Sequence, residues 1–234
     1  MKILYIFPHP DDESYGVAHV MNKQLREGHE VYLLTLTKGG ATKLRHKFNY
    51  TIEQMGEVRY SEMKDVSRYL GLTDMIVLNL PDSGLKELDP RVIEKVIEEE
   101  IRKVKPEVIV SYAVHGISGF HDHLIAHSVV KRVFVNLKEK TNYLKRYAML
   151  TLSEEDAAKV TFFKVHGSKP DEIDCIITVS EEDIEAAKGS LDYYKTYKET
   201  IENSGIKEHL SRFVYFELFM EKFDPPINDL FAGL

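Results

Sequence analysis

Short apolar runs alternate with longer amphipathic stretches along most of the chain. The apolar runs are typical of buried strands and cover residues 2–7, 30–37, 74–80, 107–113, 146–152, 174–179 and 212–220. The amphipathic stretches predict helices over residues 17–28, 56–72, 89–105 and 180–201. Strand, helix and strand units with short connections imply parallel strand pairs. The pattern therefore predicts an α/β fold, a Rossmann-like, doubly wound, mostly parallel sheet with helices on both faces.

Two further features describe the organisation of the chain. Its 234 residues show no break in composition, so we expect one α/β domain over residues 1–234. Residues 38–55 lack clean periodicity and contain a Gly-Gly pair, which predicts a long loop near the carboxyl end of the second strand. The lysines and arginine of this loop either contact an anionic group or are simply solvated.

Charge and cysteine content narrow the function classes. The net charge of -7, with 38 acids against 31 bases, argues against nucleic acid as a partner, because that affinity comes from neutralising phosphates with Lys and Arg. The apolar run after Lys2 is too short for a signal-peptide core or a membrane span. Cys175 is the single cysteine and lies in an apolar run. We expect a cytoplasmic protein without a membrane span.

The stretch FPHPDDES, residues 7–14, places titratable groups where the first strand ends. It lacks the glycines that let backbone amides approach a phosphate, so dinucleotide binding is disfavoured. His9 and Asp12 are ligand types that zinc accepts, and the neighbouring Asp11 would then be free for proton transfer. The alternative is that the acids cap the following helix, where the helix dipole favours negative charge. That alternative leaves His9 unexplained.

A second cluster follows the fourth strand, in SYAVHGISGFHDHLIAH, and holds His115, His121, Asp122, His123 and His127. Because the carboxyl ends of parallel strands meet at one edge of a sheet, a histidine here is placed to complete a site begun by the first loop. Two histidines, one carboxylate and an open position describe a catalytic zinc site. His123 and His127 are also spaced as a chelating pair of their own on one helical face.

Together, PHPDDES and GISGFHDHLIAH resemble the signatures of the zinc-dependent N-acetylglucosaminyl deacetylases, the PIG-L/LmbE-like de-N-acetylases. The resemblance covers residues 2–130. It implies that His9, Asp12 and His123 are the metal ligands and that Asp11 is the general base. It further implies that Arg59 and Asp82 contact or organise the sugar, although a helix-face ion and a turn residue are equally good interpretations of these two.

One position departs from the pattern of that family. Where the family usually has Gly-His-Pro-Asp-His, this chain has Gly119-Phe120-His121-Asp122-His123. The missing histidine is taken in the family to stabilise the oxyanion or to donate a proton. His121, one residue along, is a candidate replacement. Asp122 is a candidate to fix the tautomer of a histidine and also to cap the next helix, two roles that are compatible. We therefore count both among the candidate catalytic residues.

The resemblance implies a metal-dependent hydrolase that removes an N-acetyl group from a small-molecule N-acylated sugar of the N-acetylglucosamine type. The cofactor would be Zn²⁺, with Fe²⁺ as an alternative that the same ligands accept. Two other functions stay open: a hydrolase of a different acylated amide, and a metal-binding homologue without catalysis. Members of the family are often oligomeric, so the resemblance admits a homo-oligomer.

Overall fold

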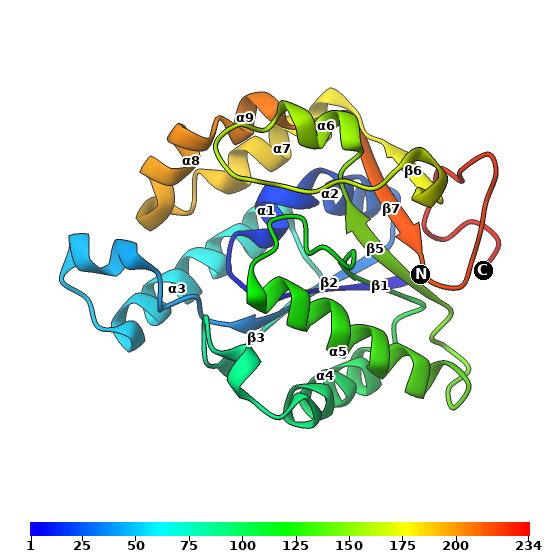
Figure 1. Ribbon diagram of the computed structural model, residues 1–234, viewed down its shortest axis with the longest axis horizontal. Coiled ribbons are helices and arrows are strands. Elements are labelled where there is room, and N and C mark those ends of the chain that lie inside the picture. The colour runs from blue at the N-terminus through cyan, green and yellow to red at the C-terminus, as the bar shows by residue number, and fades with distance from the viewer.

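The computed structural model describes residues 1–234, and its centre is a sheet of seven strands in the order β3-β2-β1-β4-β5-β7-β6 (Figure 1). The strands are β1 (Lys2–Phe7), β2 (Glu30–Thr37), β3 (Asp74–Leu80), β4 (Val108–Tyr112), β5 (Arg146–Thr151), β6 (Cys175–Thr178) and β7 (Phe213–Leu218). The first five are parallel, whereas β7 runs antiparallel to β5 and to β6. This arrangement confirms the predicted mostly parallel α/β fold.

Helices cover both faces of the sheet (Figure 1). The α-helices are α1 (Asp12–Gly16), α2 (Ala18–Arg26), α3 (Ile52–Leu70), α4 (Pro90–Val104), α5 (His121–Lys138), α6 (Glu154–Lys159), α7 (Glu181–Leu191), α8 (Lys198–Ser204) and α9 (Ile206–His209). Alternate residues of β1 point to opposite faces: Tyr5 joins the core under α2, α3 and α7, and Leu4 joins the core under α4 and α5. No helix combines the length and the apolar character that a bilayer span requires.

The predicted loop over residues 38–55 is wrong in its last part. Helix α3 already begins at Ile52, because Thr51 and Gln54 form a capping box: the Thr51 hydroxyl accepts from the Gln54 N–H, and the Gln54 side chain accepts from the Thr51 N–H. Before it, residues Lys43–Phe48 form a 3₁₀ helix with no buried residue. The loop therefore ends at Thr51, four residues earlier than the sequence predicts.

The single helix predicted over residues 180–201 is also wrong. Helix α7 ends at Leu191, a 3₁₀ turn follows at Lys195–Tyr197, and α8 begins at Lys198. The interruption is stabilised by buried hydrogen bonds, since the Tyr194 hydroxyl donates to Glu13 at 2.7 Å and the Thr196 N–H and hydroxyl both donate to Glu62. The turn places the Tyr197 ring against the guanidinium of Arg59 in α3.

Candidate active site

The loop after β1 holds Asp11 in a conformation that non-glycine residues rarely adopt, with φ 86°. The loop is tied to the end of β2, because the Thr37 N–H and hydroxyl both donate to the Pro8 carbonyl, at 3.0 and 2.9 Å. The Asp11 side chain makes no capping hydrogen bond to α1. Helix capping therefore does not account for this acid, and its carboxylate faces a cavity instead.

His9, Asp12 and His123 converge at this edge of the sheet. Asp12 lies between the two rings: its Oδ2 is 3.6 Å from His9 Nδ1 and its Oδ1 is 3.3 Å from His123 Nε2. The three ligand atoms lie within 4.8 Å of one another. Asp12 and His123 are buried, so the cluster is largely withdrawn from bulk water.

The His123 ring is fixed on its far side. Its Nδ1 is 2.9 Å from the Gly116 carbonyl, so this nitrogen carries the proton and donates, which leaves the Nε2 lone pair toward Asp12. The ring also stacks on Tyr112 at 4.3 Å between centroids and 7° between planes. Gly116 has φ 63°, and a Cβ there would lie 2.8 Å from the His123 Cβ, so this close approach requires glycine.

His9 is fixed by two acids from other elements, Asp82 in the loop after β3 and Asp122 in α5. Its Nε2 lies 3.2 Å from Asp122 Oδ2 and 3.4 Å from Asp82 Oδ1. Asp122 also accepts from the Ser83 N–H at 2.8 Å, and Asp82 accepts from the Ala41 N–H at 2.6 Å. Asp122 lies within α5, whose N-cap is Phe120, so its side chain orients His9 and the loop after β3 and does not cap the helix.

Arg59, from α3, contacts the loop after β1 at Pro10 and Asp11. Its Nη2 donates to Asp11 Oδ2 at 2.8 Å and to the Pro10 carbonyl at 2.7 Å, and its Nη1 donates to the Gly39 carbonyl at 3.0 Å. The guanidinium lies over the Tyr197 ring, 4.0 Å from its centroid. A Cβ on Gly39 would lie 2.3 Å from Arg59 Nη1, so only glycine leaves room for this arginine.

The electrostatics separate the two adjacent aspartates. Burial raises the pKa of Asp11 to about 7, although Arg59 acts to lower it. Burial also opposes ionisation of Asp12, yet His123 and His9 hold the pKa of Asp12 well below its usual range. For His9, burial acts to lower the pKa, but the bonds to Asp12 and Asp122 raise that pKa to about 10. One carboxyl is thus poised to exchange a proton near neutrality, and its neighbour stays charged.

The three converging side chains fit a divalent metal. Each imidazole has one nitrogen engaged by an outer acceptor, and the other nitrogen faces the charged Asp12 carboxylate, which is the usual arrangement of metal-ligating histidines. Two histidines and one carboxylate form the protein part of an open zinc site. Asp11 points instead to Arg59 and stays outside this donor set.

A cavity of about 430 Å³ opens over the cluster. The lining includes most of the residues expected from the sequence, namely His9, Asp11, Asp12, Arg59, Asp82 and His123. Phe120 also lines it, edge-on to the His123 ring. His121 does not: it is exposed at the first position of α5, so its catalytic role stays a prediction. His127 bonds to the Tyr112 carbonyl and stands apart from the three converging ligands.

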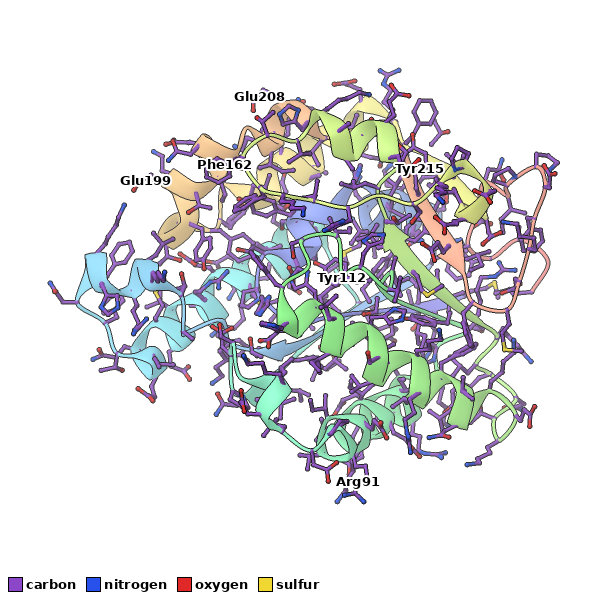
Figure 2. The ribbon with its side chains drawn as sticks, viewed as in Figure 1. Arg91, Tyr112, Phe162, Glu199, Glu208 and Tyr215 are labelled. Atoms are coloured by element: carbon purple, nitrogen blue, oxygen red, sulfur yellow. The ribbon has the colours of Figure 1, made fainter.

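Sequence reasoning missed Tyr112 and Tyr197, which support His123 and Arg59. Tyr112 lies at the end of β4, near the centre of the view in Figure 2. The sequence pattern predicted a strand at this position and no role in the site. Tyr197 lies in the segment LDYYKTYKE, whose aromatic residues indicated only a core or a subunit contact. Nothing in the local pattern signals either role, because each depends on a partner distant in the sequence.

His19 of α2 gives an expected dependence of stability on pH. It is 3% exposed, and burial lowers its pKa to about 4 although Asp183 acts to raise it. The pKa of a histidine in an unfolded chain is about 6.5. As the pH falls from there to about 4, the unfolded chain therefore binds the proton before the folded protein does. The folded state should lose about 3 kcal/mol of stability from this residue over that window.

Urea unfolding of the protein and of His19→Gln at several pH values between 7 and 4 tests this expectation. The variant should lose less stability on acidification, whereas His46→Gln, at an exposed histidine of the 3₁₀ helix, should follow the unmodified protein. Parallel pH curves for His19→Gln and the unmodified protein would contradict the expectation.

Comparison with known proteins gives a consistent family. The family model described as "PIG-L: GlcNAc-PI de-N-acetylase" matches residues 4–134. A 1D-myo-inositol 2-acetamido-2-deoxy-alpha-D-glucopyranoside deacetylase of Thermomonospora curvata is 34% identical over 152 residues, 56% of this chain and 51% of the relative. A mycothiol S-conjugate amidase of Streptomyces coelicolor is 30% identical over 161 residues, 61% of this chain and 55% of the relative. The chain thus spans about half the length of these curated relatives.

Among solved structures, the zinc-inhibited form of teicoplanin deacetylase Orf2 superposes with a TM-score of 0.72 at 12% identity, over 93% of this chain and 97% of that one. At this level of identity the likeness supports the fold alone. It extends well beyond the residues that the family model matches, into the C-terminal part of the sheet.

Proposed function

The chain belongs to the PIG-L family of GlcNAc-PI de-N-acetylases, and from this membership together with the geometry of the site we propose that it hydrolyses the N-acetyl group of an N-acetylglucosamine-type substrate. Residues 1–234 act in this proposal as one deacetylase-like domain. The observation that carries it is the separation of the two adjacent aspartates, since Asp12 faces two histidines and Asp11 faces the cavity and Arg59. A purely structural metal site has no use for the second acid.

His9, Asp12 and His123 hold the metal in this proposal, and we propose zinc, with Fe²⁺ as the alternative. A bound divalent ion supplies a Lewis acid for the acyl carbonyl and lowers the pKa of water. Asp122 keeps the His9 ring oriented through the bond at 3.2 Å. The Gly116 carbonyl does the same for His123.

Asp11 is the general base of the proposed reaction. Its carboxylate takes a proton from the attacking water and returns it to the departing amine, so that acetate and a free amino sugar leave. Arg59 positions this carboxylate and lowers its pKa against the effect of burial. Asp82 and Arg59, both on the cavity wall, are proposed to organise the sugar.

Acetate release from a panel of N-acetylglucosamine derivatives, by protein loaded with zinc, tests the proposal. The expected result is release of acetate together with one equivalent of free amine. Absence of amine release across the panel, with metal bound at full stoichiometry, would contradict it.

Phe120 offers a gain-of-function test. Its ring lies at the cavity, 5.6 Å from the His123 ring and edge-on to it, at the position where the family usually has histidine. A histidine there adds a donor for the oxyanion, and one such donor is worth about a hundred- to a thousandfold in turnover. We expect Phe120→His to raise kcat, measured as acetate release at saturating substrate.

His121→Ala is the companion variant, because the predicted role of His121 is the one that a histidine at position 120 fills in the family. A loss of turnover of about a hundredfold or more would support that role. Unchanged turnover in His121→Ala would end it, and unchanged kcat in Phe120→His would mean that the altered position is not what limits the reaction.

A second candidate is hydrolysis of a different acylated amide. It is favoured by Phe120, which makes this part of the cavity more apolar than a histidine would. The relative named as an amidase has a similar level of sequence identity to this chain, 30% over 161 residues. Release of amine from acylated metabolites that lack the sugar, with no release from the sugar panel, would identify this function.

A further inference from the structure

The cavity has two chemically different halves. The charged and metal-ligating side chains described above come from the carboxyl ends of β1 to β4 and from α3. The other half is formed by β5, β7 and the segments beside them. Its apolar lining includes Leu150, Leu152, Phe163, Leu210, Phe213 and Val214. Because β5 and β7 follow β4 in the sheet order, the apolar half lies to one side of the metal cluster.

Several polar side chains in the apolar half have partners within the protein. The Thr151 hydroxyl lies 2.6 Å from the Ser168 hydroxyl and donates to the Leu152 carbonyl at 3.0 Å. Asp156 accepts from Lys159 at 2.8 Å, and the Ser204 hydroxyl donates to the Ile201 carbonyl. These groups therefore have few free donors or acceptors for the hydroxyl groups of a sugar. The rest of the lining in this half is mainly hydrophobic.

The rim of this half exposes large apolar side chains. Phe163 is 39% exposed and Phe213 is 49% exposed, on the loop after α6 and on β7. Figure 2 shows that loop, marked by the neighbouring Phe162, in the upper part of the view together with β7, marked by Tyr215. Apolar and aromatic side chains that line a cavity are typical of ligand-binding surfaces. A volume of about 430 Å³ is in the range of cavities that enclose ligands larger than one sugar ring.

We propose that the half of the cavity over β5 and β7 binds an apolar substituent of the substrate, an alkyl chain or a ring carried next to the amino sugar. This inference rests on the proposed deacetylase function, because it places the sugar and its amide over the charged half. The substituent is carried either on the anomeric oxygen or in the acyl group. In both cases the substrate is an amphiphile, with its polar part at Asp11 and Arg59 and its apolar part against Leu150 and Val214.

Two ligand series distinguish the two sources. The first is methyl to octyl glycosides of N-acetylglucosamine, kept below their micelle concentrations, and the second is N-acetyl to N-hexanoyl derivatives of methyl glucosaminide. Binding is measured by calorimetry with Asp11→Asn protein loaded with zinc, and turnover with the unmodified protein loaded with zinc. Each methylene that enters the apolar half should tighten binding roughly two- to fourfold in the series that reaches it.

Variants connect the effect to this surface. In Leu210→Gln and in Phe163→Ser, the affinity gained between the shortest and the longest chain should shrink by about tenfold. Phe48→Ser removes an equally exposed ring from the 3₁₀ helix, outside the cavity lining, and should leave that gain intact. Affinity that is independent of chain length in both series would overturn the inference. Chain-dependent binding without any turnover would support this surface and contradict the deacetylase, and turnover without chain dependence would do the reverse.

Discussion

Replacing Asp11 by Asn should lower kcat/KM for acetate release by about a hundred- to ten-thousandfold, the usual contribution of a positioned general base. Asn has nearly the same shape, and its amide oxygen still accepts the hydrogen bond that Arg59 donates at 2.8 Å. The variant lacks only the capacity to take a proton. Metal content should not change, because the three converging ligands do not include Asp11.

The matched control is Asp65→Asn, which neutralises a carboxylate of α3 that is 41% exposed and paired with Arg68. It should retain the activity of the unmodified protein, as measured in the same assay with metal content determined in parallel. An Asp11→Asn protein that binds metal and keeps its turnover would remove Asp11 from the mechanism. A variant that loses its metal would show that Asp11 acts through the site geometry.

The strands were predictable because each carries its own signal. In a doubly wound sheet, a strand such as β1 or β4 is buried on both faces and therefore appears as a continuous apolar run ended by turn residues. Helix ends were less predictable, since the break after Leu191 depends on hydrogen bonds from Tyr194 to Glu13 and from Thr196 to Glu62. No local pattern of residues 180–201 encodes those distant acids.

The site shows the same division. The sequence indicated that the loops holding His9 and His123 should meet, because loops at the carboxyl ends of adjacent parallel strands lie side by side, and β1 pairs directly with β4. The choice of His123 among the histidines of the second loop came from the family resemblance. The sequence did not predict the orientation of either imidazole ring. Orientation depends on the Gly116 carbonyl and on Asp122, and Asp122 was equally compatible with helix capping. The pairing of Arg59 with Asp11 likewise spans 48 residues and required the register of α3.

Different partners let two adjacent aspartates differ in pKa: burial raises the pKa of Asp11 against the effect of Arg59, whereas two histidines hold the pKa of Asp12 well below its usual range. Asp11 and Asp12 share a backbone and a buried setting, yet one faces an arginine across a cavity wall and the other faces two imidazoles. The left-handed backbone conformation of Asp11 sends the two side chains in different directions. Backbone strain at one residue is thus what lets a single motif supply both a metal ligand and a base.

Replacing Arg59 by Met should destabilise the fold by about 3–5 kcal/mol, because it leaves a buried carboxylate without its charged partner. Arg59 is 2% exposed, and the change also removes donors to the Pro10 and Gly39 carbonyls. The pKa of Asp11, already raised to about 7 by burial, should rise further, because Arg59 acts to lower it. The acidic limb of the pH profile of kcat/KM should therefore move to higher pH.

A double-mutant cycle with Asp11→Asn separates the charge from the packing. If the uncompensated carboxylate is the main cost, adding Asp11→Asn to Arg59→Met should restore about 1 kcal/mol or more of the free energy of unfolding, measured in urea. Arg68→Met, which breaks an exposed pair of the same helix, should change stability by less than about 1 kcal/mol. Strictly additive losses in the cycle would mean that Arg59 stabilises the site through its carbonyl contacts and its stacking on Tyr197. In that case the low-pH limb should stay in place, because the charge of Arg59 would then have no influence on the proton of Asp11.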